Sequence, residues 1–473
     1  MRCKAVCYLI YFPLNLRPRM RQGRIPAEGL MSVGRDLFQE TGSMAYRLGV
    51  GLLGLGNVGG GVALLLMDGR ERLMEQHGLE LVVQRALVRD LAKPRRVALP
   101  EGVLTRDAGA VVDDPDIQIV SEQLGGIEPA RTLILRAMRN GKDVVTANKA
   151  VIAEHGDELF GTAKDQGVEL MFEASVAGGI PIVRSLMRGL VANRIKSVHG
   201  ILNGTTNYIL TKMTEEGGSF EERLKQAQAQ GFAEPDPTFD IDGTDAAQKL
   251  AILARIAFGS AVAVGRVFKE GIEGIGRQDI EYARELGYTI KLLAVAKVTD
   301  GHMEVRVHPA MIPSTCLLAN IRNEFNAIEV EGDAVGTQVF YGRGAGELPT
   351  ASAVVSDVVA VAGRRLRGGR RAEIVWAFHE HLPIVPMDEI VTAYSLRFLV
   401  LDRPGVLAQI TGILAEQDIS IQSVIQHGRS ADTVPLIIMT HEAVEKALRR
   451  AVAVIDRLPA VKERTRVIRV EKL

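Results

Sequence analysis

The stretch RLGVGLLGLGNVG, residues 47–59, decides the fold of this chain. It begins as a short apolar run typical of a buried strand and then places three glycines in the spacing GxGxxG. A helical pattern, GVALLLMDGRERLMEQ, follows directly. Glycines at these positions permit a tight turn and a close approach of the backbone to a pyrophosphate, which the helix N-terminus then binds. An ordinary glycine-rich turn is the alternative, but the flanking strand and helix favour a dinucleotide-binding turn formed by Gly54, Gly56, Asn57, Val58 and Gly59.

The end of the second predicted strand, LELVVQRALV (residues 79–88), bears on the choice of cofactor. An NAD-specific site places Asp or Glu there, because a carboxylate accepts a hydrogen bond from the ribose 2′-hydroxyl. This chain instead has Arg89, and Lys93, Arg95 and Arg96 follow closely. Positive charge at this edge fits a 2′-phosphate, so the sequence favours NADP over NAD, with Arg89 and Lys93 as candidate contacts. A solvated basic turn is the alternative, and Arg89 does not exclude NAD.

Strand and helix patterns then alternate from IQIVSEQLGG (residues 117–126) to VELMFEASVAGGIP (residues 168–181), which predicts a Rossmann-type doubly wound parallel sheet. Ligands of such sheets bind beyond the carboxyl ends of the strands, and Ser121, Lys149 and Glu173 fall at such ends. We therefore expect Lys149 to have a functional role. An exposed lysine at a strand end is an equally good interpretation of this residue.

A second informative stretch is GFAEPDPTFDIDGTDAAQK, residues 231–249, where a loop rich in Pro and Gly gives way to a helical pattern. Asp245 and Lys249 are four residues apart, so on a helix they share one face and hold each other in place. A lysine that faces a cluster of acids suits a small substrate with an ammonium group and an oxygen that exchanges a proton. The acids of the stretch are Glu234, Asp236, Asp240, Asp242 and Asp245.

Two plainer interpretations compete with a catalytic one. The first is a solvated acidic loop with a surface ion pair, which would stabilise the chain by roughly 0.5 kcal/mol or less. The second is a calcium loop, because DIDG resembles the centre of one. With Gly243 at the sixth position, however, the twelfth position falls on Lys249, where a calcium hand needs a bidentate Glu. The sequence therefore excludes a standard calcium hand.

The segments that follow predict two further folding units. HGILNGTTNYIL, around Asn203, indicates either a polar turn whose amides and hydroxyls bind a carboxylate or a plain helix cap. The alternating stretch KLLAVAKVTDGHMEVRVHPAMI (residues 291–312) indicates an α+β domain with an open sheet. A glycine-rich loop at residues 342–346 precedes a helix, and such a loop usually lies against a ligand or another backbone. From Tyr394, after a basic spacer, the pattern is strand, helix, strand, strand, helix, strand, which is typical of a ferredoxin-like unit.

The composition limits the classes of function. With 473 residues the chain has room for two or three domains and a large core. Lys plus Arg and Asp plus Glu number 57 each, and a zero net charge argues against a protein that coats nucleic acid or an anionic membrane. The sequence has no apolar run of about 18 residues, and its cysteines form no CxxC pair, which indicates a reducing compartment without structural zinc. We therefore expect a cytoplasmic enzyme without nucleic-acid or membrane partners.

Residues 1–43 differ from the rest of the chain. They carry Arg and Lys but no acid before Glu28, and Pro13 breaks their short apolar patch. A transit peptide has a similar composition. An upstream start codon, with Met44 as the true beginning, is the preferred explanation, because MAYRLGVGLLGLGNVG runs straight into a strand. We expect this extension to be disordered or not translated.

Taken together, these motifs resemble the homoserine dehydrogenase family in the long form that ends in an ACT domain. The resemblance runs from about residue 46 to the end of the sequence, and GFAEPDPTFDIDGTDAAQK matches a specific signature of the family. It implies the reversible oxidation of L-homoserine to L-aspartate-4-semialdehyde with NADP or NAD, the step that commits carbon to threonine and methionine. It also implies a homodimer or homotetramer, and an amino-acid effector near residues 402–406 of the ACT domain, for which L-threonine is the natural candidate.

The same resemblance assigns roles to single residues. It implies that Lys249 exchanges the proton, with Lys149 beside it near the nicotinamide and Asp245 in the same catalytic group. The implied substrate contacts are Glu234, Asp240, Asp245, Gly204 and Thr205. The implied cofactor contacts are Gly54, Gly56, Asn57, Val58, Gly59, Arg89, Lys93, Ser121, Lys149 and Gly344. A monovalent cation, usually sodium, is expected at Glu173 and the backbone carbonyls of Val176, Gly178 and Ile180.

We expect the chain to divide into five parts. They are an N-terminal extension (1–43), a dinucleotide-binding domain (44–175), a substrate-binding, catalytic and dimerisation domain (176–345), a helix that returns to the nucleotide domain (346–370) and an ACT regulatory domain (392–473). Two departures from the family pattern are visible. Asn57 stands where many members have Thr or Arg, and Ser121-Glu122-Gln123 is more polar than usual.

Two other functions stay open from the sequence alone. One is a different NADP-linked dehydrogenase that acts on an amino acid or a semialdehyde, because the fold would serve such an enzyme equally well. The other is an amino-acid sensor that keeps a dinucleotide fold but has lost turnover. The presence of Glu234, Asp245, Lys249 and Lys149 counts against the sensor.

Overall fold

The computed structural model describes residues 46–368, 381–426 and 432–473. The predicted N-terminal extension therefore lies outside the described residues. Within the described ranges, none of the helices combines the length and the apolar character that are needed to cross a membrane.

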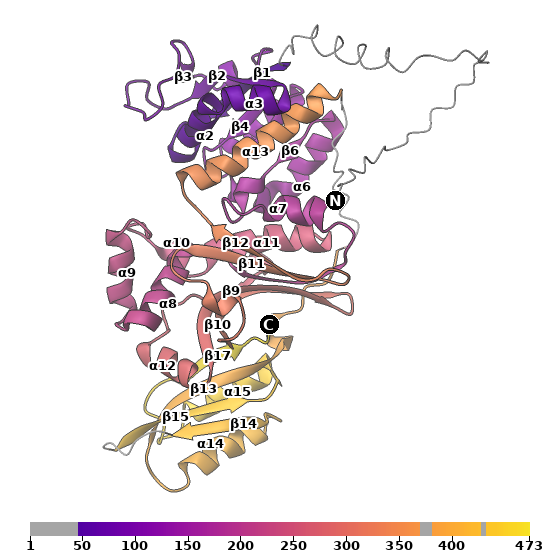
Figure 1. The fold of residues 1–473 in the computed structure, drawn as a ribbon. Coiled ribbons are helices and arrows are strands. Elements are labelled where there is room, and N and C mark those ends of the chain that lie inside the picture. The colour runs from indigo at the N-terminus through magenta and orange to yellow at the C-terminus, as the bar shows by residue number, and fades with distance from the viewer. Residues whose placement is uncertain (1–45, 369–380, 427–431) are drawn as a thin grey trace, which may run out of the picture. The chain divides into compact units, whose positions relative to one another are not determined.

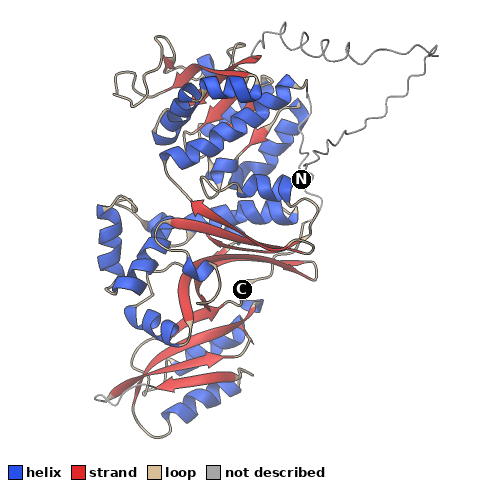
Figure 2. Cartoon of the chain, in the orientation of Figure 1, coloured by secondary structure: helices blue, strands red, loops and turns tan. Residues whose placement is uncertain are grey.

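The first sheet contains six parallel strands in the order β3-β2-β1-β4-β5-β6. Strands β2 and β3 are added on one side of β1, and β4, β5 and β6 are added on its other side. The direction in which strands are added therefore reverses between β1 and β4. Helices cover the sheet (Figure 2), which confirms the predicted Rossmann-type unit. The strands are β1 (Tyr46–Leu53), β2 (Leu79–Leu87), β3 (Leu104–Thr105), β4 (Ile119–Glu122), β5 (Asp143–Thr146) and β6 (Leu170–Met171), and the helices are α2 (Asn57–Asp68), α3 (Arg70–His77), α4 (Gly109–Val112), α5 (Ala130–Arg139) and α6 (Lys149–Gln166).

A helix from far along the sequence completes this unit. Helix α13 (Glu347–Leu366) lies beside α2 (Figure 1), and its Val354 and Val358 share a core cluster with Val62 and Leu66 of α2. At the other end of α13, Arg364 donates to Asp143 at 2.6 Å. The helix is thereby fixed to the nucleotide unit by apolar packing and by a buried ion pair.

The second sheet has eleven strands, with the path β12-β11-β7-β9-β10-β17-β13-β15-β14. Its first part is the expected open sheet, and its last four strands, with two helices, form the predicted ferredoxin-like unit. The strands are β7 (Ile195–Ile201), β8 (Phe268–Lys269), β9 (Tyr288–Thr299), β10 (His302–Pro313), β11 (Phe325–Gly332), β12 (Gly336–Arg343), β13 (Val391–Leu401), β14 (Ile421–Gln426), β15 (Thr433–Thr440), β16 (Ala443–Val444) and β17 (Arg466–Val470). The associated helices are α7 (Ile182–Arg184), α8 (Gly204–Glu216), α9 (Phe220–Ala229), α10 (Thr238–Ile241), α11 (Thr244–Phe258), α12 (Arg277–Glu285), α14 (Val406–Ala415) and α15 (Glu445–Ile455).

The two parts of this sheet are joined edge to edge, because β17 pairs with β10 in parallel through only two residue pairs. Glu471, directly after β17, reinforces the joint. Its side chain is 2% exposed and accepts a hydrogen bond from Arg306 of β10 at 2.7 Å and another from Lys297 of β9 at 3.1 Å. Burial alone would raise the pKa of Glu471, but Arg306, His308 and Lys297 hold it well below its usual range.

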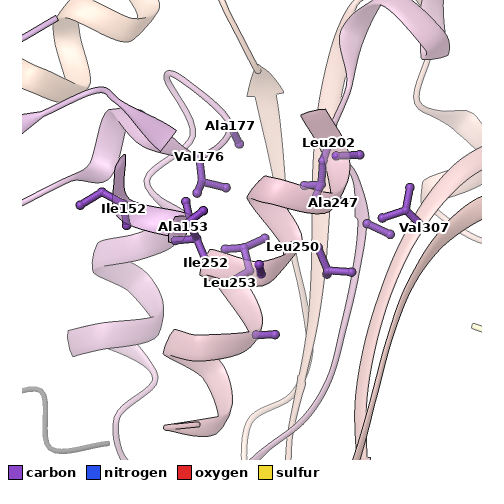
Figure 3. Packing of buried hydrophobic residues seen from close by; sticks show 14 of the residues in the cluster. Ile152, Ala153, Val176, Ala177, Leu202, Ala247, Leu250, Ile252, Leu253 and Val307 are labelled. Carbon is purple, nitrogen blue, oxygen red and sulfur yellow. The ribbon is translucent and has the colours of Figure 1, made fainter. Parts of the chain in front are cut away.

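Helix α11 is the element that carries Asp245 and Lys249, and it is packed on two sides. Figure 3 shows its Ala247, Leu250, Ile252 and Leu253 among the side chains of α6 and of the second sheet. Most residues of α11 are buried, so the helix cannot rotate without disturbing both neighbours. Burial of this helix therefore fixes the orientation of Asp245 and Lys249, which lie in its first two turns.

We predict that Glu471→Ala lowers the free energy of unfolding by about 3–5 kcal/mol, because the buried Arg306 would keep only the partly exposed Glu304 as its anion. The pH dependence has a definite sign. A carboxyl group whose folded pKa is depressed stabilises the protein above its ordinary pKa of 4.5, and this stabilisation is lost as the pH falls below that value. In chemical denaturation, the difference in unfolding free energy between wild type and variant should therefore become smaller at acidic pH.

Glu442→Ala is the matched control, because Glu442 forms an exposed ion pair with Lys472 in the same tail. Exposed pairs contribute little, so this variant should unfold close to the wild type. An equal loss of unfolding free energy in the two variants, or no loss in Glu471→Ala, would contradict the role given to Glu471 at the pairing of β10 with β17.

Candidate active site

The site is centred on Asp245, which lies in the first turn of α11 and is 4% exposed. Its Oδ2 accepts a hydrogen bond from Lys249 Nζ at 2.7 Å, and its Oδ1 lies 3.1 Å from Lys149 Nζ. Lys249 stands one turn further along α11, whereas Lys149 begins α6 directly after β5. The structure thus brings together two stretches that are a hundred residues apart in the sequence.

Electrostatics explains why the two lysines converge. Burial alone would raise the pKa of Asp245, but the ammonium groups of Lys249 and Lys149 outweigh it and lower the pKa to about 2. The carboxylate is therefore ionised at neutral pH. A buried anion is costly without partners, so Asp245 holds both amines in place.

The amine of Lys249 has a second anchor in the main chain. Nζ donates to the carbonyl oxygen of Leu202 at 2.7 Å, and the side chain is 12% exposed. Leu202 directly follows β7, so the end of that strand sets the position of the amine. An ammonium has three N–H donors, and Asp245 and Leu202 take two of them, which leaves one direction for a ligand oxygen.

The NGTTNY segment is both a helix cap and a link between acids. Asn203 precedes α8, and its Oδ1 accepts a hydrogen bond from Thr206 N at 2.8 Å, which confirms the helix cap. Its Nδ2 donates to Asp240 at 2.7 Å and to Asp245 at 2.9 Å. Thr205 Oγ1 donates to the other oxygen of Asp240 at 3.0 Å. This segment therefore sets the distance between the two carboxylates.

The rest of the acidic stretch surrounds this centre less tightly. Glu234 is exposed in the loop before α10. Asp242 is paired with Lys269 and accepts from Thr244 N at 2.8 Å, so it stabilises the start of α11. The ring of Phe239 lies 5.4 Å from Lys149 Nζ and covers that amine from one side.

A cleft of about 950 Å³ opens at the carboxyl ends of the first sheet's strands, where the strand order reverses. Its floor is the glycine turn after β1. Gly54 has φ +104°, and a Cβ on Gly59 would lie 2.1 Å from the carbonyl oxygen of Gly54, so both positions need glycine. No atom lies within 4 Å of the place where Gly56 would carry a Cβ, which leaves room for a pyrophosphate. The turn thus fits a dinucleotide, with Asn57 in the lining and Val58 packed against the core.

Basic side chains line the outer part of the cleft, and they have different partners. Arg95 donates to the carbonyl of Lys93 at 2.8 Å, so it shapes the loop. Arg96 pairs with Glu347, at the start of α13, at 3.0 Å. No ion pair of Arg89 or Lys93 occurs among the described residues. The basic residues in the lining are Arg89, Lys93, Arg95, Arg96 and Arg106.

Five of the expected cofactor contacts lie outside this lining, namely Val58, Gly59, Lys149, Ser121 and Gly344. Ser121 is fully buried and its hydroxyl is bonded to Gln123, so it is Gln123, with the two residues after it, that lines the cleft. Gly344 packs against the side chain of Asn326 and the backbone of Gly178. The polar sequence at the end of β4 explains why Ser121 is absent from the lining, because Gln123 reaches back over it.

The expected cation site contains Glu173, whose carboxylate is buried and hydrogen-bonded to the backbone. Glu173 is buried, and its two carboxylate oxygens accept hydrogen bonds from the amides of Val183 at 2.9 Å and Arg184 at 2.8 Å. Burial and the nearby Asp357 raise the pKa of Glu173 to about 7. The described residues contain no group of three or more His, Cys, Asp or Glu suited to a metal, so a cation here would depend on backbone oxygens.

Comparison with known proteins agrees with this geometry. Residues 181–359 match the family described as homoserine dehydrogenase, residues 54–173 match its NAD binding domain, and residues 394–460 match the ACT domain. The chain is 44% identical over 431 residues to a homoserine dehydrogenase of Neisseria gonorrhoeae, which covers 90% of this chain and 98% of that protein. The chain belongs to the homoserine dehydrogenase family.

Solved structures of homoserine dehydrogenases show the same fold. One from Thiobacillus denitrificans is 47% identical, with a TM-score of 0.85 over 90% of this chain and 99% of that one. A hyperthermophilic archaeal homoserine dehydrogenase in complex with NADPH is 26% identical, with a TM-score of 0.57 over 67% of this chain and 98% of that one. As a homoserine dehydrogenase, the chain is an oxidoreductase with a nucleotide-binding domain and an ACT domain.

Sequence reasoning missed four features of this homoserine dehydrogenase site. The carbonyl of Leu202 and the amide of Asn203 hold Lys249 and Asp245, and Glu347 and Arg106 line the cleft. Leu202, Glu347 and Arg106 have no local signal, because each reaches the site only through the fold. The one available hint was Asn203, which opens the polar NGTTNY segment.

Proposed function

We propose that this enzyme oxidises L-homoserine to L-aspartate-4-semialdehyde reversibly, with NADP as the preferred cofactor, in the synthesis of threonine and methionine. The observation that carries the proposal is the buried Asp245 carboxylate shared by Lys249 and Lys149. The homoserine dehydrogenase relatives support the reaction, and the geometry suggests how the residues divide the work.

Lys249 is the proton-transfer group in this proposal. The cofactor, when bound, supplies the hydride acceptor for the carbon that bears the hydroxyl. In the oxidation the neutral amine of Lys249 takes the hydroxyl proton, and in the reduction its ammonium gives a proton to the aldehyde oxygen. Asp245 aims this amine, and Lys149 adds positive charge on the same side, which stabilises an oxygen that becomes negative.

The two ends of the amino-acid substrate would be held by the acids and by the start of α8. The substrate ammonium fits Asp240, which lies in α10, and Glu234, which lies on the loop before α10. The substrate carboxylate fits the first amides of α8, at Gly204 and Thr205, because a helix N-terminus attracts anions. This arrangement places the hydroxyl-bearing carbon toward Lys249.

We predict that purified enzyme reduces NADP when L-homoserine is added, and that Lys249→Ala lowers kcat by about 1000-fold while KM changes far less. The absorbance of the reduced cofactor gives both constants. Lys212→Ala is the control, because Lys212 forms a local ion pair with Glu216 on α8. A Lys249→Ala variant with near wild-type kcat would refute the assigned role.

The same assay separates the alternative functions. A dehydrogenase for another substrate would reduce the cofactor with a different hydroxy or amino acid and stay inactive with homoserine. A sensor would bind homoserine or NADP without turnover. Either outcome with intact wild-type protein would refute the proposed reaction.

The preference for NADP over NAD rests on the basic lining of the cleft. Arg89 follows β2, at the strand end where an NAD-specific site would carry an acid. Arg89 and Lys93 line the cleft, and guanidinium and ammonium groups suit a 2′-phosphate. The solved relative that binds NADPH is consistent with this preference.

We predict that Arg89→Ala combined with Lys93→Ala raises KM for NADP by about tenfold to 100-fold, because two charged contacts to the phosphate are lost. NAD lacks this phosphate, so its KM on the same variant should change less than threefold and serves as the internal control. Equal changes in the two KM values would remove these residues from cofactor selection.

The division into parts and the cation site also remain proposals. We propose a nucleotide domain up to about residue 175, a catalytic and dimerisation domain to 345, a returning helix within 346–370 and an ACT regulatory domain from 392. We also propose that Glu173 and the carbonyls of Val176, Gly178 and Ile180 bind sodium, because these oxygens suit a hard cation.

Regulation by L-threonine is the last part of the proposal. ACT domains pair through their sheets, so we propose a homodimer or homotetramer with threonine at the turn of residues 402–406. Gly405 in this turn has φ +89° and precedes α14, whose first amides suit the effector's carboxylate. Removing the whole tail is a poor test, because it would also remove Glu471 from Arg306.

We predict that wild-type enzyme is inhibited by L-threonine and that Gly405→Asp raises the concentration for half inhibition by about tenfold or more, since a carboxylate repels the effector's own. Gly405→Asn is the matched control, because it has the same shape without the charge and tolerates positive φ. Unchanged inhibition in Gly405→Asp would place the effector elsewhere.

A further inference from the structure

Asn203 stands between β7 and α8, and its amide has all its hydrogen-bonding positions filled. The residue is 4% exposed. Its Oδ1 accepts from Thr206 N at 2.8 Å and from Thr206 Oγ1 at 2.9 Å. Its Nδ2 donates to Asp240 Oδ1 at 2.7 Å and to Asp245 Oδ2 at 2.9 Å. One small side chain therefore contacts a helix end and two carboxylates.

The orientation of this amide follows from its neighbours. The backbone N–H of Thr206 can only donate, so the atom that faces it must be the oxygen of Asn203. The NH₂ group then faces Asp240 and Asp245, which as carboxylates can only accept. Each carboxylate takes one of the two N–H donors.

The two carboxylates have different tasks in the proposed reaction, and their separation matters. Asp240 binds the substrate ammonium, and Asp245 aims the amine of Lys249. Two anions that approach one another repel, and a donor between them removes this repulsion and fixes their distance. We propose that Asn203 is a positioning residue for homoserine oxidation, whose NH₂ group sets the substrate-binding carboxylate against the proton-transfer pair. This inference rests on the proposed function.

The main chain beside Asn203 supports the same arrangement. Leu202, the residue before it, accepts from Lys249 Nζ at 2.7 Å. Two consecutive residues therefore hold both members of the proton-transfer pair, Leu202 the amine and Asn203 the carboxylate. A displacement of about 1 Å in such a group costs about 100-fold in rate. The end of β7 thus acts as a common reference for substrate and proton donor.

Two substitutions separate this role from the helix cap. Asn203→Asp keeps an oxygen for Thr206 and the size of the side chain, but it replaces the NH₂ group by an oxygen that faces two acids. Asn203→Ser keeps a capping oxygen but removes the NH₂ group, and its single, shorter hydroxyl cannot donate to both acids. We expect kcat/KM for homoserine to fall about 100-fold or more in Asn203→Asp and about tenfold in Asn203→Ser.

The pH profile provides a second measurement that a structural role would not change. A protonated Asp at position 203 regains one O–H donor. Asp240 and Asp245 beside it favour the protonated form, and Lys249 and Lys149, which contact Asp245, oppose this only in part because Asp245 already balances their charge. The deficit of Asn203→Asp relative to wild type should therefore shrink as the pH is lowered. Asn203→Ser has no such group, so its deficit should stay constant across the same pH range.

Three controls make the experiment decisive. Ser219→Ala removes the N-cap of α9, where the hydroxyl accepts from Glu222 N and from no group of the site, and should lower the melting temperature without changing kcat or KM. The affinity for NADP should be unchanged in both Asn203 variants. Wild-type activity with homoserine must be present, because its absence would refute the proposed function and not the role of Asn203.

Two results would overturn the inference while the proposed function stands. One is kcat and KM within twofold of wild type in both Asn203 variants. The other is a parallel loss of melting temperature, NADP affinity and activity in both variants, without a pH-dependent difference between them. That result would give Asn203 a purely structural role.

Discussion

The structure depends on one buried charge, the carboxylate of Asp245, which two lysines share. Lys249 reaches it from the next turn of the same helix, and Lys149 reaches it from the start of a helix in the nucleotide unit. A buried carboxylate without partners would be strongly destabilising, so the ion pairs join the two units at the proposed active site. The interaction that balances the charge is therefore also the one that sets the geometry of the site.

This interaction needs a rigid frame, and the packing provides one. Helix α11 lies between α6 and the second sheet, so the direction of Asp245 and Lys249 is set by apolar contacts on two sides (Figure 3). The same sheet continues through β10 and β17 into the ACT domain, where Glu471 and Arg306 reinforce the joint. The strands that position Leu202 and Asn203 are thereby connected to the ACT domain.

The sequence predicted the local features of this arrangement and missed those that depend on distant contacts. The GxGxxG turn with its strand and helix, and the four-residue spacing of Asp245 and Lys249, are signals within one segment, so they could be found without a fold. The family resemblance implied that Lys149 lies beside Lys249, but its ion pair with Asp245 is seen only in the structure. The part played by Leu202, and the closeness of Glu347 to Arg96, could not be predicted, because these contacts join segments with no shared local pattern. The contact of Ser121 with the cofactor stays a prediction: its strand-end position suggested it, and in the structure its hydroxyl is bonded to Gln123.

The most direct test of the account is a crystal structure of the enzyme with L-homoserine and NADPH, a pair that cannot react with each other. The account predicts that the homoserine hydroxyl oxygen lies within hydrogen-bonding distance of Lys249 Nζ. The ammonium should contact Asp240, and Asp245 should still hold both lysines. A hydroxyl group bound away from Lys249, with the amine turned toward solvent, would contradict the central claim.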